Sequence, residues 1–181
     1  MFHSQSTKQR AKSVTHANRG KFLERVIDMA NTKYRNAGLA DIRKIPTPVQ
    51  ITKDKGSQVE GRKEKPEWVD YAGVCNGRAV VFDAKETKGK SFPLQNLHEH
   101  QYELLRSWYE KGAITFLLVY FSELDKYFRL PFPPLQAAWQ TAQSGGRKSI
   151  SLATFEEHAS EAVSMDGYTL HYLLPFIESR W

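Results

Sequence analysis

Two strand-like runs joined by a short turn decide the fold: WVDYAGVC (68–75), then Asn76-Gly77, then RAVVFDAK (78–85). Asn-Gly between two β-rich runs is the strongest short-range signal for a hairpin with a two-residue type I′ turn. Such a turn fixes the register of the hairpin, so Cys75 is expected opposite Arg78. The sequence therefore predicts which residues face each other along both strands.

Counting outward from the turn brings two carboxylates together. Asp70 comes out directly opposite Asp83, and Lys85, two residues beyond Asp83, shares their face. Two like charges opposed among apolar neighbours need compensation by a shared proton, by the lysine or by a divalent cation. The pattern carboxylate, hairpin, Asp-x-Lys is that of many metal-dependent nucleases. Two interpretations stay open: a catalytic metal site, or a salt-bridged hairpin end.

The rest of the chain predicts a mixed α/β domain with a central sheet and helices on both sides. The apolar run ITFLLVYF (114–121) is expected to be a central strand, with KYFRL (126–130) beside it. The first helix is expected to start at Asn18 and to bury one stripe of side chains. That stripe comprises Phe22, Leu23, Val26, Ile27, Ala30 and Tyr34. Further helices are predicted at 94–111, 135–143 and 152–162, and an interrupted strand at 42–52.

Two strongly polar segments stand apart from this core. Residues 1–18 are predicted to be a flexible basic arm, and 19–181 the folded domain. Residues 53–67 contain almost nothing apolar, which predicts a long exposed loop or protruding hairpin. Residues considered for DNA contact are Arg19, Lys53, Lys55, Arg62, Lys63, Lys65, Lys88, Arg147 and Lys148. A solvated surface is the alternative for the arm and for the loop that holds Arg147 and Lys148.

Composition narrows the class of protein. The chain has 181 residues, a net charge of +6 and a pI near 9.4, which suits a polyanionic partner. It contains no apolar run long enough for a membrane span, and its first residues lack a secretory signal pattern. The single cysteine, Cys75, agrees with a reducing compartment. We therefore expect a cytoplasmic protein.

Five segments resemble the RecU-type Holliday junction resolvases. They are Asn18-Arg19-Gly20, PTPVQI (46–51), FDAKETK (82–88), FPLQNLHEHQ (92–101) and GRKSI (146–150). The resemblance implies a restriction-endonuclease-like fold, a central mixed sheet flanked by helices with a protruding stalk at about 53–67. It also implies a homodimer that resolves four-way DNA junctions by paired symmetric nicks and depends on Mg²⁺, with Mn²⁺ as an alternative.

The same resemblance implies roles for individual residues. Asp70, Asp83 and Gln101 would serve the metal, and Lys85 would stabilise the transition state. Asp83 departs from the family, which has Glu at that position. Trp68 stands where the family has a threonine ligand, although an indole offers no lone pair to a metal.

Two rival functions and one further residue role stay open from the sequence. The chain could be a non-catalytic protein that binds DNA junctions, or a repair or restriction endonuclease of the same fold. Glu24, on the first predicted helix, is either an outer group of the metal site or a solvated residue at the helix edge.

Overall fold

The computed structural model describes residues 16–65 and 67–178, so most of the predicted basic arm lies outside the described residues. Helix α1 (His16–Asn36) is already formed at His16. Asn18 is therefore inside the helix, and the prediction that it caps the helix is wrong. No helix in the described residues is both long and apolar enough to cross a bilayer.

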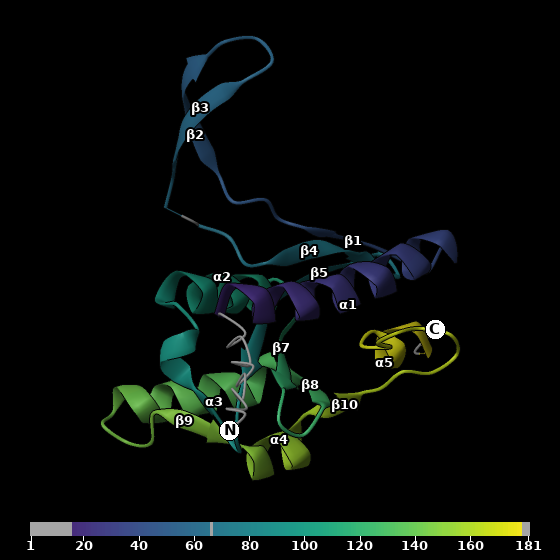
Figure 1. Ribbon diagram of the computed structural model, residues 1–181. Coiled ribbons are helices and arrows are strands. Elements are labelled where there is room, and N and C mark those ends of the chain that lie inside the picture. Colours follow the sequence, from purple (N-terminus) through teal and green to yellow (C-terminus); the bar gives the residue numbers. More distant parts are fainter. Residues whose placement is uncertain (1–15, 66, 179–181) are drawn as a thin grey trace, which may run out of the picture.

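A six-stranded mixed sheet forms the centre of the molecule (Figure 1). Its strands lie in the order β1, β4, β5, β7, β8, β10, and only β5 and β7 run parallel. This confirms the predicted mixed α/β class. The bounds are β1 Ala40–Lys44, β4 Tyr71–Cys75, β5 Arg78–Thr87, β7 Ile114–Phe121, β8 Lys126–Pro131 and β10 Ser160–Ala162.

The predicted hairpin forms with the predicted register. Cys75 pairs with Arg78, and the ladder runs without a shift to Tyr71 and Phe82. Asn76 and Gly77 have φ of 48° and 74°, the positive values that a type I′ turn needs at both central positions. The register that opposes Asp70 and Asp83 is thus built into the local sequence.

The connection from β5 to β7 differs from the single helix predicted at 94–111. A 3₁₀ turn, η1 (Leu94–Asn96), comes first, and α2 (Glu99–Glu110) begins after a break. The helix predicted at 152–162 also ends early, because α4 (Leu152–His158) gives way to strand β10. Periodicity missed the small sheet of β6 (Ser91–Pro93) and β9 (Ser149–Ser151), and helix α5 (Leu174–Glu178).

Helices cover both faces of the sheet, as predicted. Leu23 and Ile27 of α1 pack on one face together with the C-terminal segment. On the other face, α2, α3 (Phe132–Gln143) and α4 enclose a second core that contains Leu105 and Phe155. Phe22 is 49% exposed, so its predicted place in the buried stripe is wrong; its ring lies beside Tyr120 instead.

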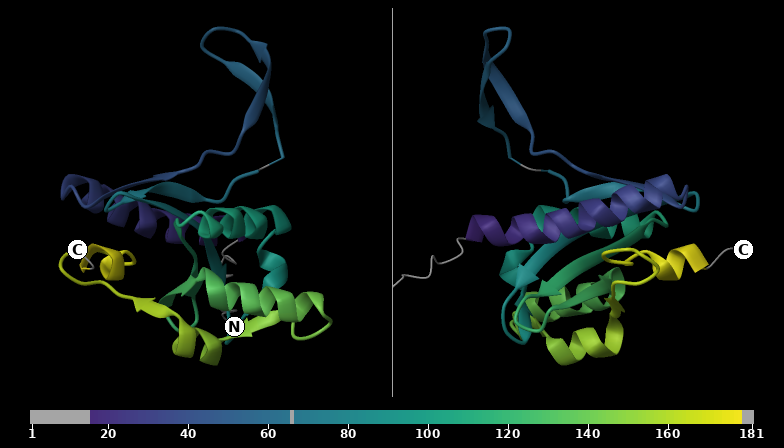
Figure 2. Two further views of the ribbon diagram at one scale, coloured as in Figure 1. Left: turned by 180° about the vertical axis from the view of Figure 1, so that it is seen from behind. Right: turned by 45° about the vertical axis from the view of Figure 1, so that its right-hand side comes forward.

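A two-stranded hairpin projects far from the sheet (Figures 1 and 2). It consists of β2 (Val49–Asp54) and β3 (Val59–Lys63), and all their residues are exposed. Its base is closed where Glu64 N donates to Pro48 O over 3.0 Å. The protruding hairpin predicted at 53–67 is thus confirmed with shifted bounds, because it begins earlier, at Val49, and its second strand ends at Lys63. We call residues 49–63 the stalk.

Candidate active site

The two predicted carboxylates meet just beyond the end of the β4–β5 ladder. Asp70 precedes β4, and its main-chain oxygen accepts a hydrogen bond from Ile45 N at 2.8 Å. Its side-chain Oδ2 accepts a hydrogen bond from Ala84 N at 3.0 Å, which brings it beside the middle of the Asp83–Lys85 segment. Asp83 itself is fully buried. The antiparallel register thus brings together the residues that the sequence predicted.

Gln101 reaches Asp83 from α2 on the same face of the sheet. Its Nε2 donates to Asp83 Oδ1 over 2.7 Å, and its Oε1 accepts from His98 N over 3.0 Å. The second bond satisfies a main-chain donor at the start of α2, as in a capping box. With this amide orientation, Gln101 holds the carboxylate of Asp83 through an N–H and directs its own oxygen toward the helix start.

Lys85 completes the group. Its Nζ lies 2.6 Å from Asp83 Oδ2, and the lysine side chain is only 19% exposed. The contact is an ion pair by distance, but Oδ2 has no directed hydrogen-bond partner among the described residues. Burial raises the pKa of Asp83 to about 7; the charge of Lys85 opposes this shift, and the charge of Asp70 adds to it. Two carboxylates, Asp70 and Asp83, therefore share the single ammonium group of Lys85 at this site.

A main-chain oxygen that side-chain reasoning missed adjoins the pair. In a strand, the N–H and C=O of one residue point to the same edge. Ala84 N donates toward Asp70, so Ala84 O faces the same edge, beyond the end of the β4 ladder at Tyr71. The middle residue of an Asp-x-Lys segment gives no chemical signal of its own; only the strand pairing reveals this acceptor.

These residues fit a hard divalent cation such as Mg²⁺. Two carboxylates, one of them with a buried oxygen that faces only the Lys85 ammonium, and a nearby main-chain oxygen form an all-oxygen donor set. No three His, Cys, Asp or Glu side chains come together as a metal site within residues 16–65 and 67–178. Mg²⁺ often binds through one or two carboxylates and keeps several waters, so two carboxylates suffice.

The candidate site opens into two pockets that share Lys85 and His98. One, of about 690 Å³, lies toward the base of the stalk and is also lined by Asp70, Trp68 and Gln101. The other, of about 650 Å³, lies between the end of β5 and η1, with Gln95 and Lys88 among its lining residues. We call these two adjacent pockets the trough; Asp70 lines it, whereas the fully buried Asp83 does not.

The predicted DNA-contacting residues fall in three places. On the stalk, Lys53 and Lys55 both pair with Glu60, which offsets part of their charge. Lys148 lies near the trough, since its main-chain oxygen accepts from Leu94 N, one residue before the pocket-lining Gln95. The other stalk cations are Arg62 and Lys63; Lys65 and Lys88 line the two pockets, and Arg147 is exposed beside Lys148. The side chain of Arg19 lies outside the described residues.

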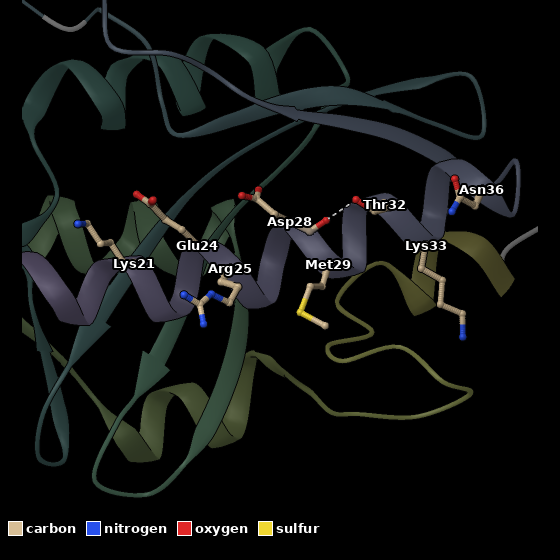
Figure 3. A pocket seen from close by; sticks show the side chains of 8 residues that line it. All are labelled: Lys21, Glu24, Arg25, Asp28, Met29, Thr32, Lys33 and Asn36. Atoms are coloured by element: carbon tan, nitrogen blue, oxygen red, sulfur yellow. Dashed lines mark hydrogen bonds between the residues drawn. The ribbon is translucent and has the colours of Figure 1, made fainter.

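A third pocket runs along α1 and shares no lining residue with the pocket at Asp70 (Figure 3). Glu24 and Asp28 point to the same side there, toward β1. Glu24 pairs with Lys44 over 2.6 Å, and Asp28 accepts a long hydrogen bond of 3.5 Å from Tyr71 OH. These contacts give Glu24 a partner of its own on β1.

A family model for "RecU: Recombination protein U" matches residues 18–178. The chain belongs to the RecU family. This family member is 36% identical to the Holliday junction resolvase RecU of Staphylococcus carnosus over 170 residues, which are 90% of this chain and 78% of that protein. It is also 38% identical to the Holliday junction resolvase RecU of Bacillus cereus strain B4264 over 164 residues, which are 87% of this chain and 82% of that protein.

A solved structure shows the same fold at low sequence identity. The Holliday junction resolvase Hjc of Archaeoglobus fulgidus superimposes with a TM-score of 0.50 at 13% identity, over 78% of this chain and 95% of Hjc. The RecU family member therefore has the restriction-endonuclease-like fold that the resemblance predicted.

Proposed function

We propose that this chain is a Mg²⁺-dependent endonuclease that resolves four-way DNA junctions by paired symmetric nicks. The observation that carries the proposal is the buried Asp83 beside Asp70 and Lys85, in a chain of the RecU family. The relatives named Holliday junction resolvase support the substrate class. An enzyme that acts on DNA in this way would work in the cytoplasm.

Each residue of the group then has a task. Asp70 and Asp83 would hold the cation, with Ala84 O as a further acceptor, and Gln101 fixes the carboxylate of Asp83 from α2. Mg²⁺, when bound, polarises the phosphoryl group and lowers the pKa of a bound water; Mn²⁺ can substitute. Lys85, released from its ion pair, directs its ammonium at the charge that develops on the scissile phosphate.

The stalk gives the preference for branched DNA. Its strands project beyond the sheet and carry basic side chains, so it can enter the opening at the centre of a junction. A homodimer places two active sites about a twofold axis, which matches symmetric incision of a symmetric substrate. The exposed cations beside the trough, Lys65, Lys88, Arg147 and Lys148, together with Arg19, contact phosphates of the arms.

The test compares Asp83→Asn with wild type on a four-way junction and on linear duplex of the same sequence. Asparagine keeps the size of the side chain and an oxygen for Gln101, but removes the charge that holds the cation. We expect cleavage to fall by at least about 10²-fold, in line with the loss of a key charge-stabilising group, with junction binding largely kept.

The matched control is Asp41→Asn, at an exposed carboxylate on β1 that pairs with Arg43. It should cleave like wild type. Unchanged cleavage by the Asp83→Asn variant would show that Asp83 is not part of the active site. Equal cleavage of junction and duplex by the wild type would favour a repair or restriction endonuclease, and binding without cleavage would favour a junction-binding protein.

A further inference from the structure

An exposed tryptophan lies beside the proposed active site. Trp68 is 44% exposed and lines the same pocket as Asp70 and Lys85. Exposed tryptophan is costly in water, and its large flat ring is a strong contact surface for ligands. Because Trp68 is only two residues before Asp70, the chain keeps its ring close to the proposed metal-binding carboxylate.

The indole of Trp68 is held in place by a ring contact and by the residues that follow it in the chain. Trp68 packs edge-to-face on Trp108, with centroids 5.8 Å apart and planes at 68°. Trp108 in turn packs against the core formed by α2, α3 and α4. Val69 is buried, and Asp70 is fixed by Ile45 N, so the segment that presents Trp68 is anchored on both residues that follow it.

The charge of the pocket argues for an uncharged contact with the substrate. Its lining holds Lys65 and Lys85 but also Glu64, Glu67 and Asp70. Two lysines face three carboxylates there, so without a bound cation these side chains give no net Coulomb attraction for a DNA strand. Stacking of a base on an aromatic ring adds attraction that does not depend on net charge.

The substrate offers bases that can be stacked. A base pair at a branch point lacks the continuous stack of a duplex, so moving its base out costs less than it does inside a duplex. A base displaced from the strand whose phosphate lies at Asp70 and Asp83 would reach a ring that lines the same pocket. The base contact and the cleaved phosphate would then belong to one strand.

We propose that Trp68 is a stacking platform for an unpaired nucleobase of the incised strand, next to the scissile phosphate. The inference rests on the proposed function and adds a determinant of junction preference to it. Trp68 touches the base and not the reacting atoms, so it is a substrate-positioning residue. It stands where the family resemblance implies a threonine ligand, so this chain uses the position for substrate instead of metal.

The experiment is photo-crosslinking with 5-iodouracil, which reacts with aromatic side chains stacked on it. Junctions carry the analogue at single positions on each side of the cleavage site, and Ca²⁺ replaces Mg²⁺ so that binding is read without cleavage. Peptide mapping of the wild type should place the crosslink on Trp68 for one position near the nick. Crosslinks only at other residues would overturn the proposal.

Two variants and a control separate stacking from folding. W68F keeps a π face and should keep the crosslink, whereas W68L keeps apolar bulk and should lose it. Removing the platform should weaken junction binding about tenfold, the order expected for one stacked base, and duplex binding less than twofold. The control is Y109L, at a similarly exposed aromatic residue on α2 that lies outside the pocket.

Failure of this inference differs from failure of the proposed function. If the wild type cleaves junctions and the W68L variant binds and cleaves them equally well, the stacking role of Trp68 is contradicted. The proposed nuclease function is then unaffected. If the wild type cleaves no junction, the proposed nuclease function is contradicted. The crosslink still reports whether a base stacks on Trp68. If W68L does not fold, the wild-type crosslink and W68F decide alone.

Discussion

Gln101 Nε2 donates a 2.7 Å hydrogen bond to Asp83 Oδ1, and this contact joins residues 18 positions apart on two different elements. The same amide accepts from His98 N, so one side chain both starts helix α2 and holds a buried carboxylate. Changes at Gln101 should therefore affect stability and metal binding together.

Gln101→Met should lower the free energy of unfolding by about 1–3 kcal/mol at neutral pH, because it leaves a buried carboxylate oxygen and a helix N–H unpaired. Urea denaturation without metal measures this. Asn96→Ala is the control: Asn96 is an exposed amide on η1, and its loss should change stability by less than about 0.5 kcal/mol. Equal stability of both variants would show that the Gln101 bond contributes nothing.

Replacing the stalk by a short Gly-Ser turn between Pro48 and Glu64 should leave the body folded. These two residues are hydrogen-bonded at 3.0 Å, so the cut ends already lie together, and every stalk strand residue is exposed. Thermal unfolding should change little, while the preference for a junction over duplex in competition binding should largely disappear. A retained preference would place junction recognition in the sheet and helices.

Neutralising two stalk cations tests charge apart from shape. Arg62→Gln with Lys63→Gln keeps the hairpin but removes two contacts to phosphates, so binding should weaken and its salt dependence should fall by a slope of roughly 2. Titration at several salt concentrations measures the slope. An unchanged slope would show that these side chains do not touch the backbone of the DNA.

Gly73→Ala should be strongly destabilising. A Cβ at Gly73 would lie 2.0 Å from Asp41 O and 2.7 Å from Ile42 Cα, so β1 would have to move away from β4. Overpacking of this kind costs about 1–3 kcal/mol and occasionally more. Gly20→Ala is the control, and it should raise the free energy of unfolding. A Cβ there meets nothing within 4 Å, and alanine favours the helix by about 1 kcal/mol. Chemical denaturation of both variants checks the pair.

His171 should make the protein sensitive to acid. Burial lowers the pKa of its ring, with Lys33 adding to the shift and Asp166 and Glu178 opposing it, and Nδ1 lies 3.0 Å from Tyr34 OH. A lowered pKa means that the unfolded chain takes up a proton first. Stability is therefore full above the unfolded value near 6.5 and falls as the pH drops below it.

The measurement is the urea midpoint of wild type and His171→Gln between pH 5 and pH 7.5. The substitution should flatten the loss of stability in that range. His158→Gln, at an exposed histidine on α4, should keep the wild-type slope. A parallel loss in all three proteins would assign the acid sensitivity to other groups.

The amino-acid sequence by itself determined the hairpin and the meeting of its carboxylates. Asn76 and Gly77 set a two-residue turn, and a turn of that length leaves one register, which places Asp70 and Asp83 one step beyond the ladder that ends at Tyr71 and Phe82. The central strand 114–121 was equally readable, because its run of apolar side chains is buried on both faces.

Only the tertiary structure decided what surrounds those carboxylates. Periodicity continued the helix through 94–111, whereas the chain breaks after η1 so that His98 can begin α2 and Gln101 can reach Asp83. The stacking surface of Trp68 likewise depends on Trp108, 40 positions away. Such contacts form when two packed surfaces fit, and side-chain spacing along one element carries no record of the element that will cover it.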